Sequence, residues 1–336
     1  MKIIWKEQDL PKANLSVLAR EAYLRVKSNK FGWFCDDTYI MPFFIDEQLH
    51  FFRRLVITQS PARIDGKEAD ETTYREFINN SIDYLSAHSS IADFIEKPQS
   101  NVVLLTPPNL LNSVKVIPWG TYVVDLTIDE EKLLGTFHTK HRNVIRKAVK
   151  DGVVVSKATI QEVHDLIADT LARQNVHSPS ISYYEKLQNN IPSNVAFYKA
   201  ELNGIVEGVA VIIYDKDCGY YMYGGSSEHH HVGSVNYLQY EIMLDLKHQG
   251  VKTYDLVGAR IVLEEGSKYE GIQRFKSRFA SSLVEGYSFK CVINKFKYWL
   301  FVNLVKLYGK LRGFHYIDSV NDTIKLMKEK GIELKI

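Results

Sequence analysis

Residues 194–258 constrain the fold of this chain more than any other stretch. Residues 194–227 contain three runs rich in aromatic and β-branched residues, with turn signals at Asn203-Gly204 and at Asp215 to Gly219. Such runs joined by short turns predict three antiparallel strands. The apolar spacing of residues 234–250 predicts a helix, and residues 252–258 predict a further strand. A glycine-containing turn therefore leads from a strand into a helix within an α+β unit.

The rest of the chain also predicts mixed α and β structure. Residues 31–59 read as antiparallel strands, residues 69–88 and 129–152 as helices, and Thr159 with Glu162 as a capping box. The expected fold class is α/β (α+β), with largely antiparallel sheets flanked by helices. We expect an N-terminal domain at 1–150, a C-terminal domain at 151–294, and a helical segment at 295–336 that packs back on the first domain.

Composition excludes several classes of protein. Of the 336 residues, 45% are hydrophobic and 24% are charged, which predicts a packed core rather than disorder. The net charge of +2 gives no field that argues for nucleic-acid binding by itself. Three widely spaced cysteines without a C-x-x-C motif fit a reducing compartment. The N-terminus lacks the apolar core of a signal peptide, and no apolar run could span a bilayer. We therefore expect a cytoplasmic protein.

Four segments carry a family resemblance when they are taken in order. They are "LGTFHTKHRNVIRKAVKDGVVV" (134–155), "YYMYGGSSE" (220–228), "NYLQYEIMLDLKHQGVKTYDLVG" (236–258) and "GIQRFKSRFASSLVE" (271–285). Together they resemble the FemABX family, the aminoacyltransferases that build peptidoglycan interpeptide bridges. The resemblance covers roughly residues 119–295. The strand, glycine turn and helix order is also that of the Gcn5-related (GNAT) acyltransferase fold.

The resemblance implies two tandem GNAT-like domains and an acyltransferase activity. Family members move an amino acid from aminoacyl-tRNA to an amine of a peptidoglycan-precursor stem peptide, and they need no metal. The expected donor is therefore aminoacyl-tRNA with no cofactor, and the acceptor is a UDP-linked or lipid-linked muropeptide. The chain departs from the family pattern at Tyr240, where tryptophan is usual, and at Ala280-Ser281-Ser282, where a glycine-rich turn is usual.

These departures leave the donor and acceptor open. One alternative is an acyl-CoA-dependent N-acyltransferase acting on a sugar or polysaccharide precursor, and another is a binding module without catalysis. Acyl-CoA enzymes of this fold hold the pyrophosphate on a glycine-rich loop that enters a helix. Here only Gly233 fits that pattern, and Val235 stands where a small residue is expected. Aminoacyl-tRNA is therefore favoured over acyl-CoA.

Lys276, in "RFKSRF", is the first candidate catalytic residue. Aminolysis of an ester passes through an oxyanion, which a fixed ammonium stabilises. The resemblance points to the same lysine, although a surface lysine beside Arg274 and Arg278 is an alternative interpretation. Tyr254 and Asp255 end a strand that reads as central, where α/β sites gather. Asp255 could hold the incoming amine or accept its proton, or it could cap the next loop.

The opening turn and the basic helix supply the candidate substrate-binding residues. Tyr223, Gly225, Ser226, Gly233 and Tyr237 surround the turn and are candidates for the acceptor pocket, with core packing as the alternative for the tyrosines. Arg142, Arg146 and Lys150 recur at intervals of four along one helix face and suit phosphate oxygens, or they form a solvated face.

Two further features have competing interpretations. In the run His229, His230 and His231, the first and third side chains would point the same way on an extended strand and could ligate a metal. No third ligand lies at a convincing spacing, so a solvated polar turn is favoured. Residues 294–314 are aromatic, aliphatic and basic without an acid. They predict a helix that packs on the domains with outward lysines, while contact with a membrane surface, at the inner face of the membrane, is the second interpretation.

Overall fold

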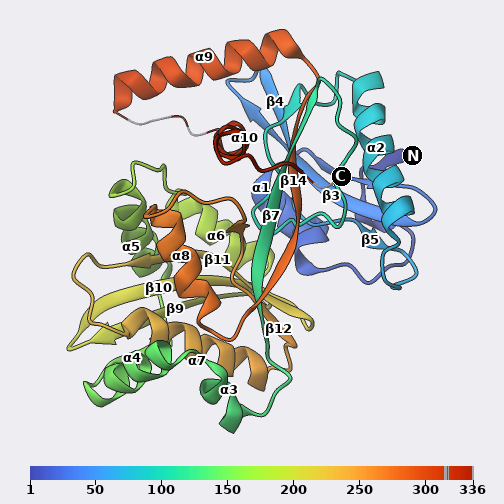
Figure 1. Cartoon of the computed structure of the whole chain (residues 1–336). Helices are drawn as coiled ribbons and strands as arrows, with labels where there is room; N and C mark the ends of the chain where they lie inside the picture. The colour runs from blue at the N-terminus through green and yellow to red at the C-terminus, as the bar shows by residue number, and fades with distance from the viewer. Residues whose placement is uncertain (314–315, 317, 335–336) are drawn as a thin grey trace. The chain divides into compact units, whose positions relative to one another are not determined.

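The structure is a computed structural model that describes residues 1–313, 316 and 318–334. The chain forms two compact units. Unit 1 comprises Met1–Gly120, Gly258–Glu270 and Val284–Ile336, and unit 2 comprises Thr121–Val257 and Gly271–Leu283 (Figure 1). The expected division into domains 1–150 and 151–294 stays a prediction. Residues 314, 315, 317, 335 and 336 of the expected C-terminal helical segment lie outside the described residues.

Unit 1 is built on a sheet with the strand order β1-β2-β3-β4-β6-β14-β7, in which β4 and β6 are parallel. The strands are β1 (Lys2–Ile4), β2 (Phe31–Cys35), β3 (Tyr39–Gln48), β4 (Phe52–Ile57), β6 (Phe94–Ile95), β14 (Ser282–Val292) and β7 (Val114–Asp125), while β5 (Ala62–Arg63) pairs with β3 and β13 (Ala259–Arg260) with β7. Ser282, Leu283 and the last five residues of β7 belong to unit 2.

Helices cover this sheet by packing their apolar side chains against it. They are α1 (Glu21–Lys27), α2 (Glu71–Ala87), α9 (Lys295–Arg312) and α10 (Ser319–Glu329), with short 3-10 turns at Glu7–Asp9 and Val17–Ala19. The apolar stripe of α2, from Tyr74 to Leu85, is buried in the main core of the unit. Asp70 begins α2 by accepting the Thr73 backbone N–H. Among the described residues, no helix is long and apolar enough to cross a membrane.

Unit 2 has the strand order β7-β12-β11-β10-β9-β8, which is antiparallel except between β11 and β12. Its other strands are β8 (Val154–Lys157), β9 (Val195–Leu202), β10 (Ile205–Tyr214), β11 (Cys218–Ser226) and β12 (Thr253–Asp255). Its helices are α3 (Glu130–Thr136), α4 (Thr139–Lys150), α5 (Ile160–Ala172), α6 (Ile181–Asn190), α7 (Ser234–His248) and most of α8 (Lys268–Ser277).

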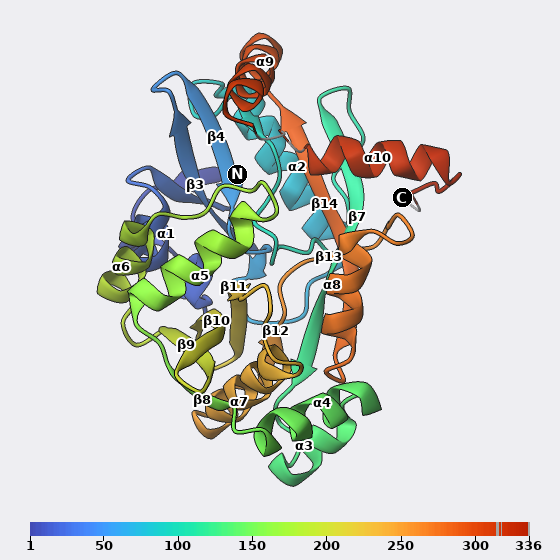
Figure 2. The same ribbon diagram turned by 90° about the vertical axis from the view of Figure 1, so that its left-hand side faces the viewer.

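The helices of unit 2 lie on both faces of its sheet, so the unit has three layers. Figures 1 and 2 both show α3, α4 and α7 on one face and α5 and α6 on the other. Helix α7 buries Leu238, Ile242, Met243 and Leu246 against the sheet, a spacing that places these side chains on one helical face. The predicted class, α/β with largely antiparallel sheets flanked by helices, is confirmed.

Most predicted elements are present, with two differences in unit 2. The three strands at 194–227, the helix at 234–250 and the capping box of Thr159 and Glu162 are confirmed. The single helix expected over 129–152 is two helices, because Phe137 is extended and the His138 side chain starts a new helix by accepting the Lys140 backbone N–H. Helix α6 was not predicted.

Candidate active site

A buried cation lies close to a buried carboxylate at the end of strand β12. Asp255 is the last residue of β12, which lies between β11 and β7. Lys276 lies in the last turn of α8. Their exposed fractions are only 6% and 9%, and charged side chains are rarely buried to this degree unless they are paired. The two residues proposed as catalytic are therefore placed together within unit 2.

Hydrogen bonds fix both groups. Thr121 Oγ1 donates a short hydrogen bond to Asp255 Oδ1, which also accepts the Val257 backbone N–H at 2.6 Å. Lys276 Nζ donates to the Val257 carbonyl oxygen at 2.7 Å. Val257 has a φ of 51°, a left-handed conformation that is rare for a β-branched residue. In this turn, the Val257 N–H points toward the carboxylate and the Val257 carbonyl oxygen points toward the ammonium.

Burial favours the neutral form of both side chains. It raises the pKa of Asp255 to about 6, against the lowering effects of Thr121, Val257 and Lys276. It lowers the pKa of Lys276 to about 8, against the raising effect of Asp255. The carboxylate is ionised and the amine protonated between these two values. The pair can therefore offer a fixed positive charge and a weak base at neutral pH.

An aromatic cluster anchors the segment that carries Lys276. Phe279, which is fully buried, meets Phe137, His141 and Phe275 at ring-centroid distances of 5.3, 4.5 and 5.0 Å. Burial, together with nearby Arg278 and His138, lowers the pKa of His141 to about 4, so its ring is neutral. Phe275 and Phe279 hold the segment, although α8 ends before Phe279. Tyr240, where the family usually has tryptophan, packs edge-on against Phe137 at 5.9 Å.

Tyr254 lies apart from this pair. Its side chain is fully buried in the core beneath α7, and its hydroxyl donates to Gln239 Oε1 at 2.7 Å. Neighbouring residues of a strand point to opposite faces of the sheet, so Tyr254 and Asp255 diverge. The observed role of Tyr254 is core packing with its hydroxyl satisfied.

The end of β11 carries three other candidates, which pack against α5 and α6. A Cβ atom added to Gly225 would lie 2.7 Å from the Leu166 carbonyl oxygen, so only glycine permits this approach of strand and helix. The Ser226 backbone N–H donates to Thr170 Oγ1 at 2.9 Å. The Tyr223 ring is partly buried and meets the Tyr183 ring at 5.7 Å. The structure thus gives Gly225 and Ser226 packing roles at this strand end.

A carboxylate of β10 that the sequence did not reveal is bonded to the turn into α7. Glu207, which is 8% exposed, accepts the His231 backbone N–H at 2.7 Å and the Ser234 hydroxyl at 2.5 Å. A carboxylate is stabilised near a helix N-terminus, which is also where this fold would hold a pyrophosphate. Gly233 has a φ of 101°, and a Cβ atom there would lie 2.1 Å from the Val144 carbonyl oxygen. Gly233 therefore permits close packing of α7 on α4.

Tyr237 and Val235 lie in the first turn of α7. Tyr237 is partly buried, and burial raises its pKa to about 12, with a contribution from Glu241. The Val235 side chain points toward β10, since a Cβ atom added to Gly208 would lie 3.2 Å from it. Val235 is thus turned into the fold rather than across the turn.

The basic stripe of α4 is divided between two environments. Arg142 Nη1 donates to the carbonyl oxygens of Gly135 and Phe137 at 2.8 Å each, which caps the end of α3. Arg146 and Lys150 are exposed on α4. Arg142 therefore has a structural task, while Arg146 faces solvent.

The histidine run forms a hydrogen-bonded turn. The His230 ring bonds to the Ser227 carbonyl oxygen at 2.8 Å, and His231 Nε2 lies 2.8 Å from Asp151 Oδ2. Within the residues that the structure describes, no group of three His, Cys, Asp or Glu side chains could hold a metal ion.

Two partners of the buried pair could not be found from sequence. Thr121 lies on β7, two residues from Val123, the position that pairs with Asp255 across the strands. The Val257 carbonyl oxygen acts through the backbone, which carries no side-chain signal. The alternation of strand residues placed Thr121 on a definite face, but the register with β12 is needed to match it to Asp255.

Comparisons with known proteins agree with the motifs. The FemAB family model matches residues 111–207 and 204–306, which together span more than half of the chain. A crystal structure of FemX has a TM-score of 0.62 and 15% sequence identity, and the match covers 89% of this chain and 99% of that one. The C-terminal domain (DUF2156) of an Agrobacterium fabrum protein named as a lysylphosphatidylglycerol synthetase has a TM-score of 0.51 and 15% identity, covering 81% of this chain and 87% of that one.

No curated protein matches the chain. The family model nevertheless covers the basic helix, the strand and turn at the start of α7, and the buried pair. The FemX structure shares the fold over nearly its whole length, so the fold predicted from the resemblance is confirmed. The chain therefore belongs to the FemAB family and is an acyltransferase.

Proposed function

We propose that the protein moves an amino acid from aminoacyl-tRNA to an amine of a peptidoglycan-precursor stem peptide. The observation that carries the proposal is the Lys276–Asp255 pair, held at the end of β12 in a chain of the FemAB family. Oxyanion stabilisation by a preorganised charge is the main catalytic demand of ester aminolysis. The proposed acceptor is a UDP-linked or lipid-linked muropeptide.

The proposed reaction needs one cation and one proton acceptor. The neutral amine nitrogen attacks the ester carbonyl carbon, which forms a C–N bond and places a negative charge on the carbonyl oxygen. The Lys276 ammonium stabilises that charge. The C–O bond to the tRNA ribose then breaks, and the proton lost by the amine passes, directly or by way of Asp255, to the departing ribose oxygen. An amide and a free tRNA hydroxyl result.

The carboxylate of Glu207 supports a tRNA donor over acyl-CoA. The His231 backbone N–H, just before α7, and the Ser234 hydroxyl are bonded to this buried carboxylate, and a pyrophosphate beside it would meet like charge. Transfer from acyl-CoA to a sugar or polysaccharide precursor remains the alternative function, supported by the glycine turn and α7 in the position that this fold uses for a cofactor.

Incubation with each donor separates the two functions. The purified protein is given a UDP-linked muropeptide with either charged tRNA or acetyl-CoA, and products are identified by mass spectrometry. The proposal expects a mass increase of one amino-acid residue from tRNA alone, and its loss in Lys276→Met. Transfer from acetyl-CoA would support the alternative. Binding of both reactants without any product would contradict both functions.

A further inference from the structure

Helix α9 presents an apolar outer face to solvent. Large apolar side chains that are more than half exposed gather on it, and they are Phe296 (67%), Trp299 (61%), Leu307 (55%), Tyr308 (54%) and Leu311 (76%). Exposed apolar residues scattered singly are ordinary, but a contiguous group on one helix marks a site of interaction. The arrangement needs a partner with an apolar surface.

The inner face of α9 holds the helix firmly on unit 1. Phe301, which is 6% exposed, meets the rings of Phe52 and Phe94 at 5.5 and 4.9 Å. Lys297 Nζ donates to the Phe51 carbonyl oxygen at 3.0 Å, and Asn294 caps the first turn. Because these contacts fix α9 on unit 1, its outer face keeps a defined orientation toward solvent.

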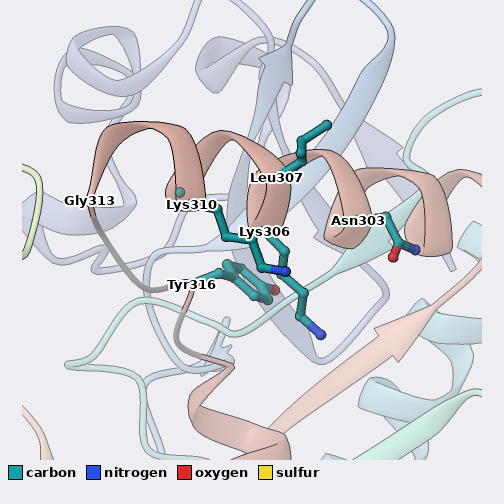
Figure 3. Close-up of a pocket in the computed structure, with 7 residues that line it drawn as sticks. Asn303, Lys306, Leu307, Lys310, Gly313 and Tyr316 are labelled. Carbon is teal, nitrogen blue, oxygen red and sulfur yellow. The ribbon is translucent and has the colours of Figure 1, made fainter.

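The charge of α9 has one sign. The helix carries Lys295, Lys297, Lys306, Lys310 and Arg312 and no acidic residue. Figure 3 shows the Lys306 and Lys310 side chains on one side of the helix, near Tyr316, with Leu307 on the other side. At 100° per residue, Lys306 and Lys310 both lie along one edge of the stripe of Phe296, Leu307 and Leu311.

We propose that the outer face of α9 binds the surface of a bilayer that contains anionic lipids. An interfacial helix has an apolar face that enters the boundary between headgroups and acyl chains, with lysines and arginines beside it at the phosphates. Trp299 and Tyr308 are the residue types that favour this boundary. The helix has 18 residues and lies on the surface, since no described helix is suited to span a membrane.

This surface acts independently of which acyl group is transferred. A lipid-linked acceptor presents its reactive peptide close to the headgroups, so a protein that rests on the bilayer would search for it in two dimensions. The proposed membrane contact rests only on the residue composition of α9 and on the exposure of its side chains, and not on the proposed reaction.

Vesicle co-sedimentation tests the proposal. The full chain is mixed with vesicles of phosphatidylcholine alone or of phosphatidylcholine with phosphatidylglycerol. Binding to the anionic vesicles is expected, with a blue shift of Trp299 fluorescence. The double variant Leu307→Ser/Leu311→Ser should partition about tenfold more weakly. Lys306→Gln and Lys310→Gln should each weaken anionic binding about fivefold.

Matched controls distinguish binding by this surface from nonspecific binding through other exposed apolar residues. Leu49→Ser and Leu110→Ser change exposed leucines of unit 1 outside α9 (74% and 55% exposed) and should leave binding unchanged. Circular dichroism checks that each variant is folded. Absence of wild-type binding to the anionic vesicles, or equal binding by Leu307→Ser/Leu311→Ser, would overturn the proposal. So would a dimer in solution that the same double substitution dissociates, because a second copy would then be the occupant.

Discussion

The charge on Lys276 is costly to bury, and its surroundings show how the cost is offset. Removing an ammonium from water disfavours the charged form by several kcal/mol unless other groups compensate. The Val257 carbonyl oxygen and the Asp255 carboxylate provide that compensation. A lysine with a lowered pKa beside a carboxyl with a raised pKa is an arrangement that enzymes use for chemistry, although structural ion pairs also produce it.

Lys276→Met tests the catalytic role directly. The substitution keeps the length of the side chain but removes the ammonium, so turnover should fall by ~10²-fold or more. The measurement is the single-turnover rate of aminoacyl transfer. Lys268→Met, on the exposed first turn of the same helix, is the control and should keep wild-type activity. Full activity in Lys276→Met would remove this lysine from the mechanism.

The pH dependence of kcat/KM should follow the two buried groups. Activity requires the carboxylate form of Asp255 and the ammonium form of Lys276, so it should rise as pH increases through about 6 and fall through about 8. Lys276→Arg keeps a cation with a much higher pKa, so the fall should move to higher pH in this variant. An unchanged alkaline limb in an active Lys276→Arg protein would assign that limb to another group.

At the scale of elements, close packing of helices on one another and on the sheet fixes the positions of the glycines. Gly233 caps the start of α7 where that helix packs on α4, and Gly225 lies near the end of β11 where the strand approaches α5. Both belong to the stretch that suggested a binding site in the sequence. A glycine-rich stretch between a strand and a helix can therefore reflect packing as well as ligand binding.

Gly233→Ala should destabilise the protein more than Gly250→Ala. Both glycines have a positive φ, but a Cβ atom at Gly250 meets nothing within 4 Å, while one at Gly233 strikes the Val144 carbonyl oxygen. We expect a loss of about 1 kcal/mol for Gly250→Ala and roughly 3 kcal/mol or more for Gly233→Ala. Urea unfolding gives both values. Equal losses would mean that α4 moves away at little cost.

Elements with strong periodicity were predictable from sequence, and weaker ones were not. The strands β9–β11 and helix α7 follow clear patterns of two and 3.6 residues. Helix α6 buries only Tyr184 and Leu187, too few residues to define a stripe. Lys276 and Asp255 were predicted from motifs, whereas Thr121 and Glu207 required knowledge of which strands and turns adjoin.

At the scale of the whole molecule, the three cysteines of the chain are free, and Cys35 and Cys291 are buried, as small apolar residues often are. No disulfide therefore contributes to the internal stability of the two units. Their stability rests on the sheet cores and on the helices that cover them.

Dialysis against EDTA should leave transfer activity and the unfolding midpoint unchanged. The proposed chemistry uses the ammonium of Lys276, and the ring nitrogens of His230 and His231 bond to Ser227 and Asp151. Elemental analysis of the purified protein provides the second measurement. Stoichiometric zinc that resists dialysis, with activity lost on its removal, would contradict this expectation.

The order of the segments along the chain has a consequence for biosynthesis. Unit 2 is interrupted, because the chain leaves it at Gly258 and returns at Gly271. A ribosome therefore completes β12 and its carboxyl before it makes the helix with the matching ammonium. The pair can form only after that helix has been made, and until then Asp255 lacks its matching cation.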